Sequence, residues 1–131
     1  MDCSRTACDA KAWGEGPLCL VHLLAHLSEH LEEDERGDLR ALLSTLSFRE
    51  REIVKLRSGL GDGHGYSRLE VGRLFKLDVT AVARIEDEVA TRMANPVRSR
   101  VLAGCVDRLP NDKLSNALRV GLIIKAVHES S

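Results

Sequence analysis

Leucines and other apolar side chains recur at three- and four-residue steps along most of this chain. That spacing places them on one face of a helix. The first stripe, within residues 18–33, consists of Leu20, Leu23, Leu24, Leu27 and Leu31. Further helical patterns cover residues 39–46, 48–58, 68–75, 78–93, 98–108 and 112–128. Because no segment alternates apolar and polar residues over a useful length, the pattern predicts an all-α fold.

Residues at the helix boundaries carry capping signals. Ser47 and Glu50 have the spacing of a capping box, and Asp78 suits the N-cap of the helix that follows it. Gly59 is placed to end a helix in the left-handed conformation, and Pro96 is placed to end the helix before it. We expect the helices to bury Ile53, Val54, Leu56, Leu69, Val71 or Gly72, Leu74, Val82, Ile85, Val89, Met93, Leu114, Leu118, Leu122 and Ile124 or Val127.

Composition narrows the class of protein. The 131 residues suffice for one domain or two small ones, and the net charge of −1 argues against indiscriminate binding of nucleic acid. No apolar run approaches the roughly 20 residues of a membrane helix, and the N-terminus lacks the apolar core of a signal peptide. We therefore expect a cytoplasmic protein without membrane contact, whose four cysteines bind metal or remain thiols.

Three of the cysteines and a histidine lie close together in the sequence. Cys3, Cys8, Cys19 and His22 have the spacing C-x4-C-x10-C-x2-H. Four such ligands suit a structural tetrahedral zinc, and one helical turn places Cys19 and His22 on the same face. The segment resembles short zinc knuckles of DNA-associated proteins. Free thiols, or an iron–sulfur or redox role, are the alternatives. His26 and His30 continue the helix face of His22, and we expect them to face solvent, with a separate three-histidine metal site as the alternative. Cys105 is expected to be a small buried residue.

Residues 46–96 carry the motifs with the strongest implication for function. Two short helices joined by a tight turn follow the helix-turn-helix plan. The segments that matter are Leu-Ser-Phe-Arg-Glu-Arg-Glu-Ile at 46–53, Arg-Ser-Gly-Leu-Gly-Asp-Gly at 57–63, Val-Gly-Arg-Leu-Phe at 71–75, Ile-Glu at 85–86 and Asn-Pro-Val-Arg-Ser at 95–99. In this order they resemble region four of bacterial sigma factors. We expect a zinc module and first helix at 1–35, a region-four-like domain at 36–100, and a C-terminal helical extension at 101–131.

The helix that reads DNA in that family departs from the family pattern here. The family's arginine and glutamate positions fall on Val79, Thr80, Ala81 and Ala83, and only Arg84 keeps a long donor. Each good bidentate base contact is worth about 1–3 kcal/mol, so recognition of the usual promoter element should be lost. The acidic residues at 78 and 86–88 would in addition repel the phosphates of the DNA backbone. Either the domain reads different DNA, with Arg73, Val79, Thr80, Ala83 and Arg84 as the candidate contacts, or the scaffold is kept for protein contact.

The resemblance implies one such protein contact. Region four grips the flap of the RNA polymerase β subunit through its first helices, and the matching apolar residues are Leu43, Leu46, Phe48, Ile53 and Leu56. The alternative interpretation is that these side chains form the core of the domain itself.

Three hypotheses for function follow. The first is a transcription-associated factor like a free-standing region four, which binds RNA polymerase or another transcription protein and modulates initiation without acting as a complete sigma factor. The second is a helix-turn-helix regulator with altered DNA specificity. The third is a helical adaptor, for which the C-terminal helices would form a homodimer unless they fold back on the domain. No catalytic motif is present, and Asp62 with His64 in a glycine-rich loop is a poor dyad, so we expect no enzyme.

Overall fold

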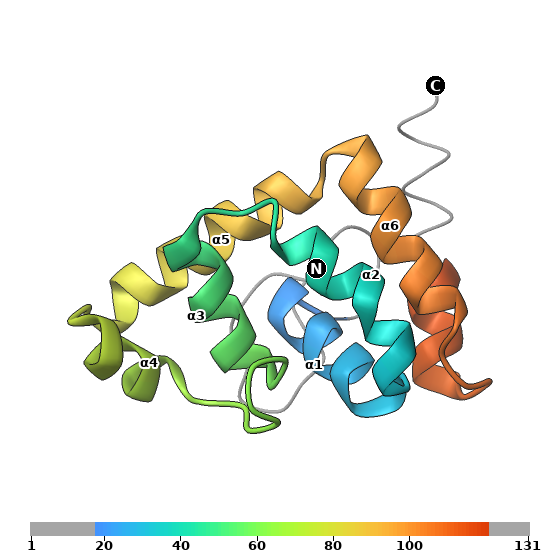
Figure 1. The fold of residues 1–131 in the computed structure, drawn as a ribbon, viewed down its shortest axis with the longest axis horizontal. Coiled ribbons are helices and arrows are strands. Elements are labelled where there is room, and N and C mark those ends of the chain that lie inside the picture. Colours follow the sequence, from blue (N-terminus) through green and yellow to red (C-terminus); the bar gives the residue numbers. More distant parts are fainter. Residues whose placement is uncertain (1–17, 121–131) are drawn as a thin grey trace.

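The computed structural model describes residues 18–120 of the chain, and Figure 1 shows their arrangement. These residues form helices without any strand, as the sequence predicts. A further helical stretch at 113–120 follows the last of the labelled elements. The labelled elements are α1 (Leu20–His30), the 3-10 helix η1 (Glu33–Arg36), α2 (Gly37–Leu43), α3 (Phe48–Ser58), α4 (Arg68–Phe75), α5 (Val79–Met93) and α6 (Pro96–Asp107).

The predicted caps are confirmed. The Glu50 backbone N–H donates to Ser47 Oγ over 3.3 Å, and the Ser47 N–H donates to Glu50 Oε1 over 3.2 Å. Gly59 ends α3 at φ 86°, in the left-handed region where glycine has no Cβ to clash. The Asp78 carboxylate accepts the Ala81 N–H over 2.7 Å at the start of α5. These local signals therefore set the helix ends.

Pro96 begins a helix, two residues earlier than the sequence pattern indicates. The helix before it, α5, ends at Met93, and Asn95 caps α6 by accepting the N–H groups of Val97 and Arg98. Proline fits the first helical position because the N–H that it lacks would have no partner inside the helix. The proline thus limits α5 and starts α6 at the same point.

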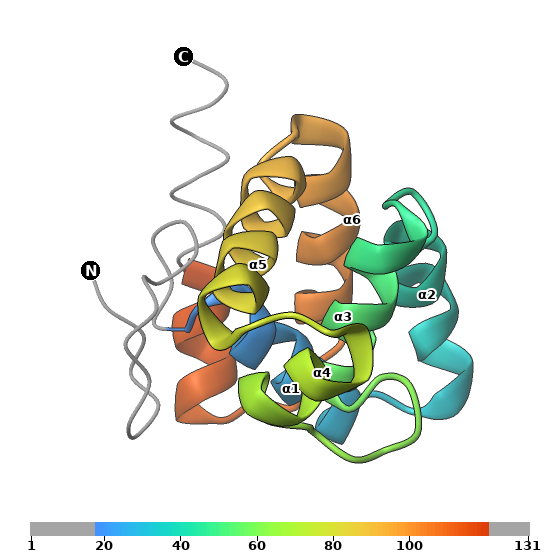
Figure 2. The same cartoon turned by 90° about the vertical axis from the view of Figure 1, so that its left-hand side faces the viewer.

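A large apolar cluster forms the centre of the molecule. It takes residues from Leu18 to Leu118 and includes Leu24, Leu27 and Leu39, each at most 1% exposed. The helix α1 packs against α3 and α5, while α2 packs against α6. Figures 1 and 2 show α1 lying among these helices. The leucine stripe predicted for the first helix is therefore the inner wall of the core.

A smaller cluster holds the helix-turn-helix together. Ile53, Val71 and Val82, from α3, α4 and α5, are each fully buried in it. The predicted burial of Leu69 and Leu74 is wrong, since they are 52% and 64% exposed. The helix α4 has only eight residues, and its inner side is occupied by Val71, Gly72 and the half-buried Phe75, so the two leucines face outward.

The start of the C-terminal extension folds back onto the domain. Leu109 and Leu118 are buried in the large cluster, as predicted for Leu118, and Leu114 packs against it. His26 lies beside this segment and is only 4% exposed, so the prediction that it faces solvent is wrong. Its ring Nε2 lies 3.1 Å from Ser115 Oγ, 89 residues away in sequence. The predicted burial of Leu122, Ile124 and Val127 lies outside the described residues.

Candidate functional site

The turn between α4 and α5 is tight. The Leu77 N–H donates to the Gly72 carbonyl over 2.8 Å, and Lys76 takes a left-handed conformation at φ 58°. A Cβ on Gly72 would lie 2.5 Å from the Leu77 carbonyl oxygen. Only glycine therefore allows the two segments to approach this closely. The result is the short helix α4 followed, after a tight turn, by the longer α5, which is the helix-turn-helix arrangement.

The second of these helices, α5, has two distinct faces. Val82, Glu86, Val89 and Met93 are buried and point toward the rest of the domain. Four of the five candidate DNA contacts lie on the other side: Val79 is 43% exposed, Thr80 and Arg84 are exposed, and Ala83 is half-buried. The fifth, Arg73, is exposed on α4. The structure thus brings the four together at the start of α5, and the DNA contact itself stays a prediction.

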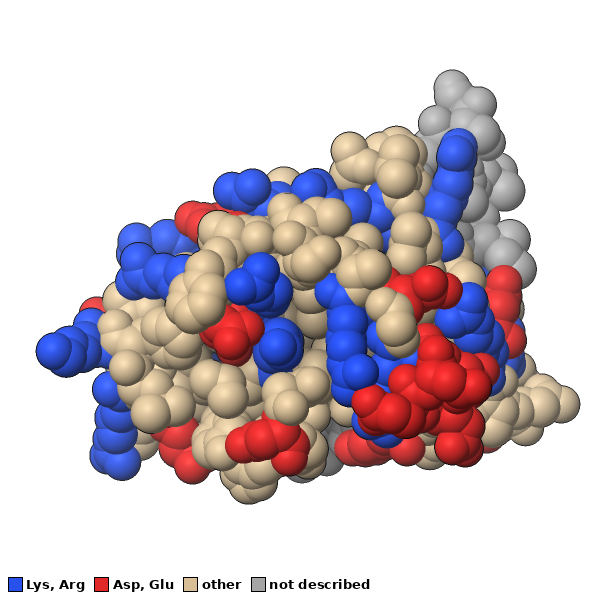
Figure 3. All heavy atoms as spheres, in the orientation of Figure 1, with Lys and Arg blue, Asp and Glu red and all other residues tan. Residues whose placement is uncertain are grey.

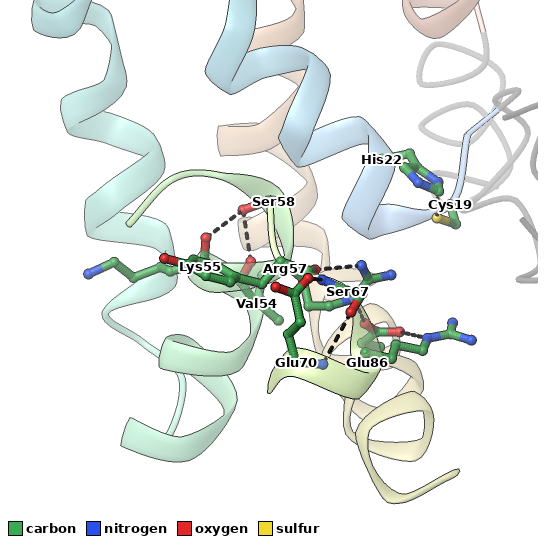
Figure 4. A network of polar contacts seen from close by, with 11 residues as sticks. Cys19, His22, Val54, Lys55, Arg57, Ser58, Ser67, Glu70 and Glu86 are labelled. Atoms are coloured by element: carbon green, nitrogen blue, oxygen red, sulfur yellow. Dashed lines mark hydrogen bonds and ion pairs between the residues drawn. The ribbon is translucent and has the colours of Figure 1, made fainter. Parts of the chain in front are cut away.

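Glu86 is the centre of a buried ion-pair cluster. Its Oε1 accepts from Arg57 Nε over 2.5 Å, and its Oε2 accepts from Arg68 Nε over 2.9 Å. Arg57 also donates from Nη1 to the Tyr66 carbonyl over 2.9 Å. Figure 4 shows Glu86 reaching from α5 toward Arg57 on α3. Because this carboxylate faces inward, it does not belong to the acidic face that the sequence suggested for the reading helix.

Sequence reasoning did not single out this cluster, although one signal was present. Glu86 stands in register with Val82, Val89 and Met93, which are apolar. A carboxylate within an apolar helix stripe is rarely buried without a partner. The partners themselves lie 29 and 18 residues away, so their identity depends on the tertiary fold.

Charge is unevenly distributed over the surface. Figure 3 shows acidic side chains gathered over η1 and the adjoining end of α2, and basic side chains projecting where α4 meets the start of α5. Within the acidic group, a hydrogen bond from Arg40 lowers the pKa of Glu33. The exposed basic residues near the start of α5 are Arg73, Lys76 and Arg84.

The helix-turn-helix nevertheless carries no net charge. Residues 68–93 contain five basic and five acidic side chains, which cancel. These are Arg68, Arg73, Lys76, Arg84 and Arg92 against Glu70, Asp78, Glu86, Asp87 and Glu88. A module that depends on phosphate contacts is usually clearly basic. The electrostatic basis for tight DNA binding is therefore weak.

The candidate polymerase contacts do not form one surface. Leu43 and Leu46 are buried in the large cluster and Ile53 is fully buried in the smaller one, so these three side chains serve the domain's own core. Leu56 is half-buried. Phe48, at the start of α3, is 67% exposed, and the Arg51 guanidinium lies 5.4 Å from the centre of its ring. A partner could therefore reach Phe48 far more easily than the others.

Half of the candidate zinc ligand set falls within the described residues. Cys19 precedes α1, and its Sγ lies 3.2 Å from His22 Nδ1, with both side chains close together in Figure 4. A tetrahedral zinc separates a sulfur and a nitrogen ligand by roughly 3.5 Å, so this pair fits such an ion. Cys3 and Cys8 lie outside the described residues, and zinc remains a prediction.

Two further chemical candidates have structural explanations. Cys105 is buried, and loss of hydration raises its pKa, which suits an inert thiol in a core. Asp62 accepts the Tyr66 hydroxyl over 2.7 Å and the His64 backbone N–H over 3.0 Å. The bond from Tyr66 is the main cause of a lowered pKa at Asp62. This carboxylate therefore secures the loop before α4.

Comparisons with known proteins agree with the helix-turn-helix geometry. The chain is 34% identical over 79 residues to the RNA polymerase sigma-C factor of a Nostoc species, 60% of this chain and 19% of that protein. It is 39% identical over 67 residues to sigma factor SigA1 of Synechococcus elongatus and 36% identical to SigA of Microcystis aeruginosa, in each case over 51% of this chain. The chain contains a sigma-factor-like region.

The extent of these matches is limited. The match to SigA1 covers 17% of its length and the match to SigA 16%, so the chain spans less than a fifth of these relatives. No protein-family model matches the chain, and no solved structure does. Among the described helices, none is long and apolar enough to cross a membrane.

Proposed function

We propose that this protein is a transcription-associated factor that binds RNA polymerase through its sigma-factor-like region and modulates initiation. The observation that carries the proposal is the similarity to sigma factors over 51–60% of a chain that contains a helix-turn-helix. The zero net charge of residues 68–93 and the short side chains at the start of α5 favour contact with protein over contact with bases. The domain would thus dock on the polymerase, for which the β flap is the expected partner surface.

Phe48 is the residue of the expected docking surface that can be changed without touching the core. We expect Phe48→Asp to weaken binding to core RNA polymerase of the native host at least tenfold, since exposed aromatic side chains frequently dominate interfaces. Affinity should be measured by pull-down and by biolayer interferometry with purified polymerase. The matched control is Leu74→Asp, because Leu74 is 64% exposed but lies on α4.

Circular dichroism should show both variants to be folded before their affinities are compared. Wild-type protein that fails to associate with the polymerase at all would reject the proposed function. Equal binding by the two variants would leave the function standing and remove Phe48 from the interface.

A DNA-reading regulator is the second candidate, favoured by the exposed Arg73, Lys76 and Arg84 beside the start of α5. Three phosphate contacts predict a slope of about −3 for log affinity against log salt concentration. We expect weak binding with no sequence preference and a slope that Arg84→Ala makes shallower by about 1. Fluorescence anisotropy over a salt series would measure the slope, with Arg40→Ala on α2 as the control.

A different outcome would favour the second candidate over the first. Selection from a random duplex library that returns one sequence, bound at physiological salt, would indicate a DNA reader. The adaptor hypothesis has less support, because Leu109 and Leu118 already pack into the large cluster of the same chain. Within residues 101–120, the exposed large apolar side chains are Val101 and Val120.

A further inference from the structure

The C-terminal half of α1 carries three metal-ligating side chains on one side. His26, Glu29 and His30 stand at positions i, i+3 and i+4, which adjoin each other on a helix surface. One ligand atom from each lies within 4.8 Å of the other two. The two imidazole rings have their centres 4.3 Å apart. Small rotations of the exposed Glu29 and His30 would bring all three ligand atoms around one ion.

A second segment holds the buried member of this group in place. Ser115 Oγ donates to Asp112 Oδ2 over 3.1 Å and lies 3.1 Å from His26 Nε2. With its proton directed at Asp112, the hydroxyl accepts from an Nε2–H of His26. That arrangement puts the neutral ring's lone pair on Nδ1, the state that a metal ligand needs. The Ser115 N–H also donates to Asp112 Oδ1 over 2.7 Å, so the carboxylate is itself held firmly.

This chain of contacts has the form of an outer ligand shell. Histidines that bind metals commonly donate their second N–H to an oxygen that a carboxylate in turn orients. The bond from the Ser115 N–H is the main cause of a lowered pKa at Asp112. Asp112 therefore stays ionised beside the two imidazoles.

We propose that His26, Glu29 and His30 form a binding site for a divalent zinc-class cation, supported by Ser115 and Asp112. Two imidazoles and one carboxylate are the ligand types that zinc accepts, whereas magnesium and calcium prefer sets made of oxygen alone. Water would complete the coordination on the exposed side. The bound ion would fix His26 against Ser115 and so strengthen the attachment of residues 111–118 to α1.

This site is separate from the cysteine-containing set at the start of the chain. Thiolate ligands give cobalt a strong charge-transfer absorption, whereas imidazole and carboxylate ligands do not. Replacing zinc by cobalt in the full-length protein therefore reports the two sites independently. The expectation for His26, Glu29 and His30 is the same whether or not the cysteines bind metal.

The decisive variants change only exposed ligands, because His26 is buried and its loss could unfold the chain. Metal-free full-length protein should be titrated with zinc by calorimetry and with cobalt by absorption spectroscopy. We expect His30→Gln with Glu29→Gln to abolish one binding event and to leave any thiolate-to-cobalt band unchanged. Asp112→Asn should keep that event but weaken it about tenfold, as loss of an outer-shell partner does.

The control is His64→Gln, which removes an exposed histidine from the loop before α4 and should bind as the wild type does. Zinc should also raise the melting temperature of the wild type more than that of the double variant. The proposal is overturned if the folded double variant binds zinc with the same stoichiometry and affinity as the wild type. It is equally overturned if the cobalt complex of the wild type shows thiolate ligation only.

Discussion

Replacing Glu86 with alanine is expected to lower the free energy of unfolding by about 3 kcal/mol. The substitution leaves the Arg57 and Arg68 guanidinium groups together without the carboxylate that they share. Their side chains are only 16% and 23% exposed, so water replaces the lost partner incompletely. Because the cluster joins α3, α4 and α5, the loss should affect the helix-turn-helix as a unit.

Urea denaturation followed by circular dichroism would measure this effect. Glu88→Ala is the matched control, since it removes the same charge from an exposed position on the same helix and should change stability by no more than about 0.5 kcal/mol. Equal stability of the two variants would mean that the ion-pair cluster contributes nothing to the fold.

Gly72→Ala is expected to destabilise the domain by about 2–3 kcal/mol. The added methyl group would lie 2.5 Å from the Leu77 carbonyl oxygen, and the obstacle is backbone that cannot rotate away. Relief requires α4 and α5 to move apart, which also strains the Leu77 N–H bond to the Gly72 carbonyl. The damage should therefore be greatest at the turn between the two helices.

The same substitution at Gly104 supplies the control. Gly104 lies within α6 and has no heavy atom within 4 Å of where a Cβ would be, so Gly104→Ala should stabilise the protein by about 0.5–1 kcal/mol. Thermal melts of both variants would test the contrast. A stable Gly72→Ala variant would show that the turn tolerates a wider separation than the structure has.

Sequence reasoning succeeded where the cause was local. The Ser47–Glu50 capping box, the left-handed Gly59 and the Asp78 cap depend on residues within a few positions of each other. The leucine stripe of α1 was also readable, because its spacing alone defines a face. The sigma-factor-like region was recognisable for a related reason, since its motifs are short and contiguous.

The failures arise from contacts between distant segments. Leu69 and Leu74 were expected inside, yet α4 is too short to bury more than one narrow side. His26 is expected in solvent because it shares a helix face with polar residues such as His22 and His30, whereas its partner Ser115 comes from the other end of the domain. The burial of Leu43, Leu46 and Ile53 depends likewise on packing between helices that lie apart in the sequence.

The inward and outward side chains of α5 contribute differently to the fold. Its inward positions hold Val82, Glu86 and Val89 in the core and in the ion-pair cluster, while Val79, Thr80 and Arg84 contribute to neither. We therefore expect substitutions on the outward side to change stability little. The outward surface of α5 can thus vary in chemistry while the architecture of the domain stays the same.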